Sequence, residues 1–164
     1  MLRVLHLTDT HVVAREDAGD PPRSFAGAVA LVQGRTTTQM LAAVLAAVAA
    51  AGVEPDLVLH TGDVTDDGTA DSCRVIRDQL AALGVPVVAV PGNHDDLVVL
   101  GDAFGHDPVP VRWVEAGGWT VVAVDTAVLH QDHGSLTAAA LADLDAVLTA
   151  ASGPVLVGLH HPPH

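Results

Sequence analysis

The stretch LVLHTGD, residues 57–63, decides the fold and marks one edge of it. Its apolar run, Leu57 to His60, lacks the strict alternation of a half-exposed strand, which is typical of a parallel strand covered on both faces. Gly62 and Asp63 follow after Thr61, and a glycine before a carboxylate indicates a tight turn with the backbone close to a bound ion. We therefore expect a buried strand whose carboxyl end presents an acidic side chain.

Similar apolar runs recur along the chain and are separated by segments with helical periodicity. The other expected strands are Val4 to Leu7, Val85 to Val90, Trp119 to Val124 and Val155 to Leu159. The expected helices are Thr36 to Ala51, Ala70 to Leu83 and Leu136 to Ala151. Strands that alternate with helices through short connections predict an α/β fold with a largely parallel sheet.

Two segments depart from this alternation. Trp113 to Val124 contains Gly117-Gly118, which favours a hairpin or an edge pair. Val13 to Arg35 has weak periodicity, and we interpret it as a long functional loop over one end of the sheet. Because the sequence shows no repeat and no linker, it predicts a single domain over residues 1–164.

Composition narrows the classes of partner. The chain has 49% hydrophobic residues, enough for a core, and a formal net charge of −13, which argues against nucleic acid as a partner. The single Cys73 excludes an internal disulfide and a cysteine-rich zinc site. The first residues lack the apolar run of a signal peptide, and Met40 to Ala51 is too short to span a bilayer. We therefore expect a cytoplasmic protein without a membrane partner.

Metal-ligating residue types follow four of the expected strands at the point where each strand ends. They are Asp9, His11, Asp63, Asn93, His94, Asp95, His160 and His161. Since the carboxyl ends of strands in an open α/β sheet share one edge, these side chains are expected to converge there. Carboxylate, imidazole and amide oxygen ligands without thiolate favour two divalent ions drawn from Mn, Fe, Co and Zn. Such a pair can clamp a phosphoryl group, and a bridging water that has lost its proton can attack phosphorus in line.

The order of these motifs resembles that of the calcineurin-like metallophosphoesterase family. The matching motifs are Asp9-Thr10-His11, Gly62-Asp63, Gly92-Asn93-His94-Asp95 and His160-His161-Pro162-Pro163. The stretch from Val124-Asp125-Thr126 to Leu141, which contains Gly134-Ser135-Leu136-Thr137, is similar to the class III cyclic-nucleotide phosphodiesterase branch. The resemblance runs from Leu2 to His164 and implies a metallophosphoesterase-type α/β sandwich.

The resemblance also implies roles for the individual residues. Asp9 and His11 would hold the first metal, and Asp63 would bridge both metals. Asn93 and a strand-end histidine would hold the second, with His160 favoured over His161 because it ends the strand.

Two further residues, His94 and His161, would act on the substrate, and Asp95 would support His94. His94 would protonate the leaving oxygen or stabilise charge. Asp95 would orient His94 through a hydrogen bond, with a plain capping role as the alternative. His161, in the proline-rich loop, is expected to touch the substrate.

Two further polar residues near these motifs are given structural roles. His60 is interpreted as a packed or metal-adjacent histidine, and Asp66 as a cap of the following helix.

One family motif is missing from the sequence. The family pattern continues to a Gly-His-x-His motif that supplies one further histidine to each metal, and this motif does not occur here. The expectation is a truncated domain in which the C-terminal part of the second sheet is missing.

Three functions stay open on this basis. The first is metal-dependent hydrolysis of a phosphodiester small molecule, with a 3′,5′-cyclic nucleotide as the leading substrate, through attack of a metal-bridging hydroxide. The second is a general phosphatase or glycerophosphodiesterase with the same site. The third is an inactive fragment or binding module that lacks two metal-ligand histidines. An apolar sheet surface left exposed would favour a homo-oligomer.

Overall fold

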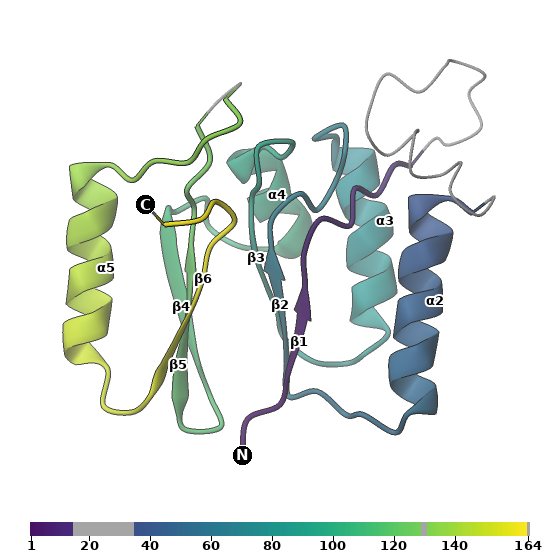
Figure 1. Cartoon of the computed structure of the whole chain (residues 1–164), viewed down its shortest axis with the longest axis horizontal. Coiled ribbons are helices and arrows are strands. Elements are labelled where there is room, and N and C mark those ends of the chain that lie inside the picture. Colours follow the sequence, from purple (N-terminus) through teal and green to yellow (C-terminus); the bar gives the residue numbers. More distant parts are fainter. Residues whose placement is uncertain (15–34, 129–130, 164) are drawn as a thin grey trace.

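The computed structural model describes residues 1–14, 35–128 and 131–163, and it shows two β-sheets packed between helices (Figure 1). The strands are β1 (Val4–Leu7), β2 (Leu57–Thr61), β3 (Val87–Val90), β4 (Val111–Ala116), β5 (Trp119–Val124) and β6 (Val155–Gly158). The helices are α2 (Thr37–Ala50), α3 (Ala70–Ala81), α4 (Leu97–Phe104) and α5 (Ala138–Ala150).

The first sheet has the order β1-β2-β3, with all neighbouring strands parallel. The central strand β2 is buried along its whole length, as its continuous apolar run predicts. Val58, on one face of β2, belongs to a core cluster with Leu41 of α2, Ile76 of α3 and Leu100 of α4. This face of the sheet is therefore covered by α2, α3 and α4.

The second sheet has the order β4-β5-β6, in which β4 and β5 are antiparallel and β5 and β6 are parallel. A second core cluster joins Leu59 and Val88 of the first sheet to Val121 of the second, so the two sheets pack face to face. Helix α5 lies outside the second sheet (Figure 1). The result is an α/β sandwich, which confirms the expected fold class.

The predicted elements are present, with shifts at their ends. The hairpin over Trp113 to Val124 is confirmed as β4 and β5. Strand β3 begins at Val87 rather than Val85, and β6 ends at Gly158 rather than Leu159. Helix α5 begins at Ala138 rather than Leu136, because Thr137 is its N-cap and accepts a hydrogen bond from the Ala140 N–H.

Helix α4 was not expected from the sequence. Asp96 caps its first turn by accepting hydrogen bonds from the N–H groups of Val98 and Val99. Gly105, in the left-handed conformation, ends it. Its two turns are too short to show a helical period, and Gly101 in its middle lowers helix propensity.

Three expectations are not decided by these elements. Most of the long loop from Val13 to Arg35 lies outside the described residues. The single domain over residues 1–164 and the missing part of the second sheet stay predictions. Among the helices of the described residues, none combines the length and apolar character that a membrane span requires.

Candidate metal centre

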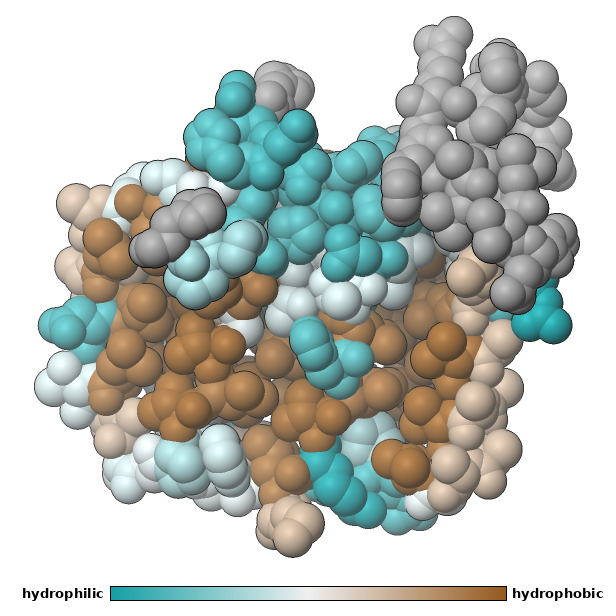
Figure 2. All heavy atoms as spheres, in the orientation of Figure 1, coloured by the Kyte–Doolittle hydropathy of each residue, from teal (hydrophilic) through white to brown (hydrophobic). Residues whose placement is uncertain are grey.

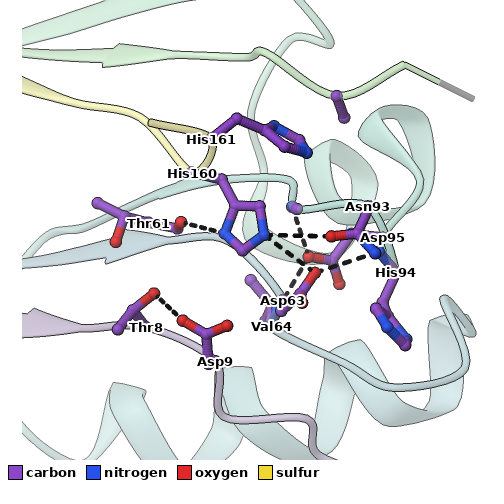
Figure 3. Close-up of polar contacts among 12 residues, drawn as sticks. Thr8, Asp9, Thr61, Asp63, Val64, Asn93, His94, Asp95, His160 and His161 are labelled. Atoms are coloured by element: carbon purple, nitrogen blue, oxygen red, sulfur yellow. Dashed lines mark hydrogen bonds and ion pairs between the residues drawn. The ribbon is translucent and has the colours of Figure 1, made fainter. Parts of the chain in front are cut away.

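The strands β1, β2, β3 and β6 deliver the candidate ligands to one end of the two sheets (Figure 3). Figure 2 shows hydrophilic residues gathered over this end of the molecule, above a broad hydrophobic face. Two groups of side chains each place three ligand atoms within 4.8 Å of one another: His11, Asp63 and His94 in one group, and Asp9, Asp63 and His160 in the other. The predicted convergence is therefore present, with Asp63 common to both groups.

The grouping differs in one respect from the implied roles. Asp9 and His11 were expected to share one metal, whereas Asp9 groups with His160 and His11 groups with His94. Asp63 lies between the two groups, which is the position that a bridging carboxylate requires.

Asp63 is 5% exposed, and its carboxylate is held from several sides. Its Oδ1 accepts a hydrogen bond of 3.1 Å from the His94 backbone N–H and lies 3.6 Å from His160 Nε2. Its Oδ2 lies 3.5 Å from His11 Nε2. A Cβ atom at Gly92 would fall 2.1 Å from Asp63 Oδ1, so only glycine at this position leaves room for the carboxylate.

Asp9, His11 and Asp63 all have left-handed backbone conformations, with φ of 52°, 44° and 48°. Such a conformation costs a non-glycine residue roughly 1–2 kcal/mol, so the surroundings must hold it. The Asp9 N–H donates to the Gly62 carbonyl and the His11 N–H to the Asp63 carbonyl, each at 3.0 Å. These bonds join the two strained loops to each other at the candidate centre.

His160 is oriented by a backbone carbonyl. Its Nδ1 lies 2.9 Å from the Thr61 carbonyl oxygen, so in the neutral imidazole the proton is on Nδ1. The lone pair of Nε2 then faces Asn93 Oδ1 at 3.3 Å and Asp63 Oδ1 at 3.6 Å (Figure 3). Three electron-rich atoms that converge in this way form a donor set that fits a divalent cation.

Of the two roles expected for Asp95, the structure shows the contacts of the capping role. Its carboxylate accepts hydrogen bonds from the backbone N–H groups of Val64, Thr65 and Gly92 at 2.9, 2.9 and 3.0 Å, and from the Thr65 hydroxyl at 3.0 Å. Asp95 therefore connects the loop after β2 to the loop after β3 through hydrogen bonds. It does not orient the His94 ring, whose Nδ1 contacts Asp66 instead. Burial raises the pKa of Asp95, although these backbone hydrogen bonds act in the opposite direction.

The orienting group for His94 is Asp66, which sequence reasoning assigned to a helix cap. His94 Nδ1 lies 3.0 Å from the Asp66 carbonyl oxygen and 3.6 Å from its carboxylate. The buried Asp66 carboxylate also lies 3.2 Å from His11 Nδ1. The N-cap of α3 is instead Thr69. The sequence feature that could have indicated this role is the position of Asp66, only three residues after Asp63 in the same short loop.

The charges around His94 set its protonation. Burial lowers the pKa of His94, whereas the Asp66 carbonyl oxygen and three nearby carboxylates raise it by more, so the net shift is upward. A larger fraction of His94 is therefore protonated near neutral pH than for a free histidine.

His161 packs beside the centre. It is 7% exposed, its ring meets the His160 ring edge-on at 4.9 Å, and its Nδ1 lies 2.8 Å from the Thr126 hydroxyl. Its Nε2 is buried and has no hydrogen-bond partner among the residues that the structure describes. Burial, and secondly the charge of His160, lower the pKa of His161, which favours the neutral ring.

A cavity of about 410 Å³ adjoins the centre on the side of His94. Asn93, His94, Asp96, Asp125 and Val128 are among its lining residues. A cavity of this size is within the range that accommodates small molecules.

The chain is similar to known phosphoesterases over almost its whole length. A family model described as "Calcineurin-like phosphoesterase" matches residues 2–164. A probable cyclic nucleotide phosphodiesterase of Synechococcus sp. is 33% identical over 165 residues, which cover 99% of this chain and 58% of that protein. A 3′,5′-cyclic-nucleotide phosphodiesterase of Nostoc sp. is 30% identical and covers 99% of this chain and 57% of that protein.

A further relative is named for a different activity. A glycerophosphodiester phosphodiesterase of Enterobacter lignolyticus is 33% identical over 118 residues, which cover 66% of this chain and 42% of that protein. The chain thus spans about half the length of the curated relatives that it matches.

Proposed function

The chain belongs to the calcineurin-like phosphoesterase family, and from that premise we propose that it hydrolyses a phosphodiester at the Asp63 centre, with a 3′,5′-cyclic nucleotide as the leading substrate. The observation that carries the proposal is the shared position of Asp63 between two groups of potential ligands. The choice of cyclic nucleotide is supported by the two relatives from Synechococcus and Nostoc, which match 99% of the chain.

The donor set defines how the centre would be loaded. The proposed ligands of two divalent ions are Asp9, His11, Asp63, Asn93 and His160, and Mn, Fe, Zn and Co suit these donors. Two such ions, when bound, neutralise phosphoryl oxygens and make water acidic enough to lose a proton near neutral pH. The protein's own part is to hold the carboxylates and imidazoles in place before loading.

His94 is the proposed proton donor to the leaving oxygen. Its Nδ1 is engaged by the Asp66 carbonyl, so Nε2 is the nitrogen available for proton transfer. The raised pKa of His94 increases the protonated fraction near neutral pH, as a general acid requires. Asp95 supports this position indirectly, because it fixes the backbone around Gly92 just before His94.

His161 is the proposed substrate contact. Its Nδ1 and its backbone N–H both meet the Thr126 hydroxyl, at 2.8 and 3.4 Å. If the hydroxyl accepts from the backbone N–H and donates to Nδ1, the ring proton is on Nε2, where it is a buried donor beside the centre. Such a donor suits a phosphoryl oxygen once the substrate is bound.

A glycerophosphodiester is the second candidate substrate, and the relative from Enterobacter lignolyticus favours it. Both candidates are phosphodiesters and use the same centre, so they differ in the group that the neighbouring cavity accepts. Relative rates on a cyclic nucleotide and on glycerophosphoethanolamine decide between them.

The centre itself is tested with Mn²⁺ and bis(p-nitrophenyl) phosphate. We expect Asp63→Ala to lower kcat/KM by about 1,000-fold or more, because both groups lose their shared carboxylate. Asp143→Ala, on the exposed surface of α5, is the matched control and should retain full activity. An Asp63→Ala protein as active as wild type contradicts the proposal, and a wild-type chain that binds no metal and hydrolyses nothing favours the inactive binding module.

Self-association is proposed for the same chain. Trp113, Leu141, Leu148 and Val157 leave 38–51% of their surface exposed on β4, α5 and β6. Exposed apolar side chains of this size favour contact with a second copy.

A further inference from the structure

His60 is the penultimate residue of β2, the strand that leads into the loop with Asp63, and it is fully buried. It occupies a position at which its neighbours Leu57, Val58 and Leu59 are apolar core residues. Burial lowers the pKa of His60 to about 3, so the ring is neutral. A neutral imidazole has one donor and one acceptor nitrogen, and burial removes the hydrogen bonds that both nitrogens would make to water.

One nitrogen of His60 is used, and the bond has a defined direction. The Thr10 hydroxyl donates to the Val64 carbonyl oxygen at 2.8 Å and lies 2.9 Å from His60 Nε2. Because a hydroxyl has a single proton, its oxygen must accept from His60 Nε2–H. His60 Nδ1 then has no hydrogen-bond partner among the described residues. An unmet buried acceptor destabilises a protein, so packing alone does not favour histidine here.

Thr10 is the residue between two candidate ligands. Asp9 belongs to the group with His160 and His11 to the group with His94, so Thr10 connects one ligand of each group. Asp9 and His11 are both in the left-handed conformation, and each is held through its backbone N–H by the loop after β2. The Thr10 side chain adds a third link to that loop through Val64.

We propose that His60 and Thr10 are a positioning pair. His60 Nε2–H donates to the Thr10 hydroxyl, which in turn donates to the Val64 carbonyl oxygen. These two hydrogen bonds hold the segment from Asp9 to His11 in its metal-binding geometry. The inference rests on the proposed function, because it assigns the pair to metal affinity. Neither residue touches the substrate in this role. Their effect passes through the two ligands on either side of Thr10.

The test measures Mn²⁺ binding to the metal-free protein by titration calorimetry. Thr10→Val keeps the side-chain shape and removes the hydroxyl, and we expect it to weaken Mn²⁺ binding roughly 10- to 100-fold, as loss of a residue that supports a ligand does. Thr10→Ser keeps the hydroxyl and should stay within about 3-fold of wild type. Thr120→Val is the matched control, since Thr120 is a buried threonine bonded to Glu115 in the second sheet.

A second variant tests the donor. His60→Leu should weaken Mn²⁺ binding in the same direction, and the double variant should be no weaker than Thr10→Val alone, because both changes interrupt one chain of hydrogen bonds. At saturating Mn²⁺ the kcat of Thr10→Val should return to within about 3-fold of wild type. Circular dichroism of the metal-free variants checks that each one folds.

The outcomes separate this inference from the proposed function. Wild-type protein that binds no Mn²⁺ overturns both. Wild-type binding together with unchanged binding by Thr10→Val overturns the positioning pair alone. Equal weakening by Thr10→Ser and Thr10→Val, or additive effects in the double variant, likewise contradicts a role for the hydroxyl.

Discussion

The two sheets of this protein are of similar size but differ in the residues that come directly after their strands. Every strand of the first sheet is followed by a candidate ligand: Asp9 and His11 after β1, Asp63 after β2, and Asn93 and His94 after β3. In the second sheet only β6 is followed by one, His160. The first sheet therefore builds most of the centre, and the second closes it from one side.

The difference extends to backbone and burial. The three left-handed non-glycine residues of the described chain all lie in loops of the first sheet, and β2 carries the fully buried His60. The second sheet exposes Trp113 and Val157. We conclude that unfavourable conformations and buried polar groups are concentrated where the ligands must be placed, which is the usual association of strain with function.

The largest expected effect compares one glycine from each sheet. Gly92→Ala would place a Cβ atom 2.1 Å from Asp63 Oδ1 and 2.4 Å from its backbone nitrogen, so we expect the free energy of unfolding to fall by about 3 kcal/mol. Hydrolysis should fall at least about 100-fold, because Asp63 has to move. Denaturant unfolding and the bis(p-nitrophenyl) phosphate assay measure the two effects.

Gly118→Ala is the control in the hairpin of the second sheet. Gly118 has φ of 80° and no atom within 4 Å of an added Cβ, so only backbone strain of about 1 kcal/mol is expected, with unchanged kcat/KM. If the two alanine variants lose the same activity, the assignment of the centre to the first sheet is wrong.

The next largest expected effect is a loss of stability on acidification, which is caused by His60 on β2 of the first sheet. The pKa of His60 falls from 6.5 to about 3 on folding, so between these values the unfolded chain binds more protons than the folded one. The His60 contribution to stability is complete above pH 6.5 and is lost as the pH falls. From pH 7 to pH 5 the free energy of unfolding should decrease by about 2 kcal/mol through this group.

His60→Leu isolates that contribution, since other groups such as Asp95, whose pKa is raised, act with the opposite sign. Urea unfolding of both proteins at pH 7, 6 and 5 is the measurement. The variant should lose less stability on acidification than wild type. Parallel pH profiles would show that His60 does not titrate in this way.

The smallest effect is expected on the outer surface of the second sheet. Trp113 is 51% exposed on β4, so Trp113→Ser should change the free energy of unfolding by less than about 0.5 kcal/mol and leave kcat/KM unchanged. It should weaken self-association, which sedimentation over a concentration series measures. Wild-type protein that remains monomeric at high concentration contradicts the proposed oligomer.

The sequence predicted the fold and the centre where the signal was local. Runs such as Leu57 to His60 report burial on both faces, and ligand types just after these runs report the common edge of parallel strands. These local patterns are why both the family resemblance and the convergence of Asp9, His11 and Asp63 could be predicted from the sequence.

The features that the sequence did not predict depend on three-dimensional contacts. Asp66 reads as a helix cap because acidic residues before a helix usually cap it, and only the folded loop brings it to His11 and His94. Asp95 reads as a partner of its neighbour His94, yet the crossing of two loops offers it several N–H groups. The link from His60 to Thr10 joins a strand to the loop after its neighbour, which no local pattern reports.

The central place of β2 has a consequence for how the protein folds. Val4 pairs with Leu57, and Val58 pairs with Val87, so β2 gains both neighbours only after long segments of chain have closed into loops. Loop closure costs entropy before the strand pairing compensates for it, which makes parallel sheets of this kind slow to form. Because Asp63 lies just after β2, a partly folded chain lacks the candidate cation site. If the centre binds metal as proposed, metal uptake during refolding reports the last steps of sheet assembly.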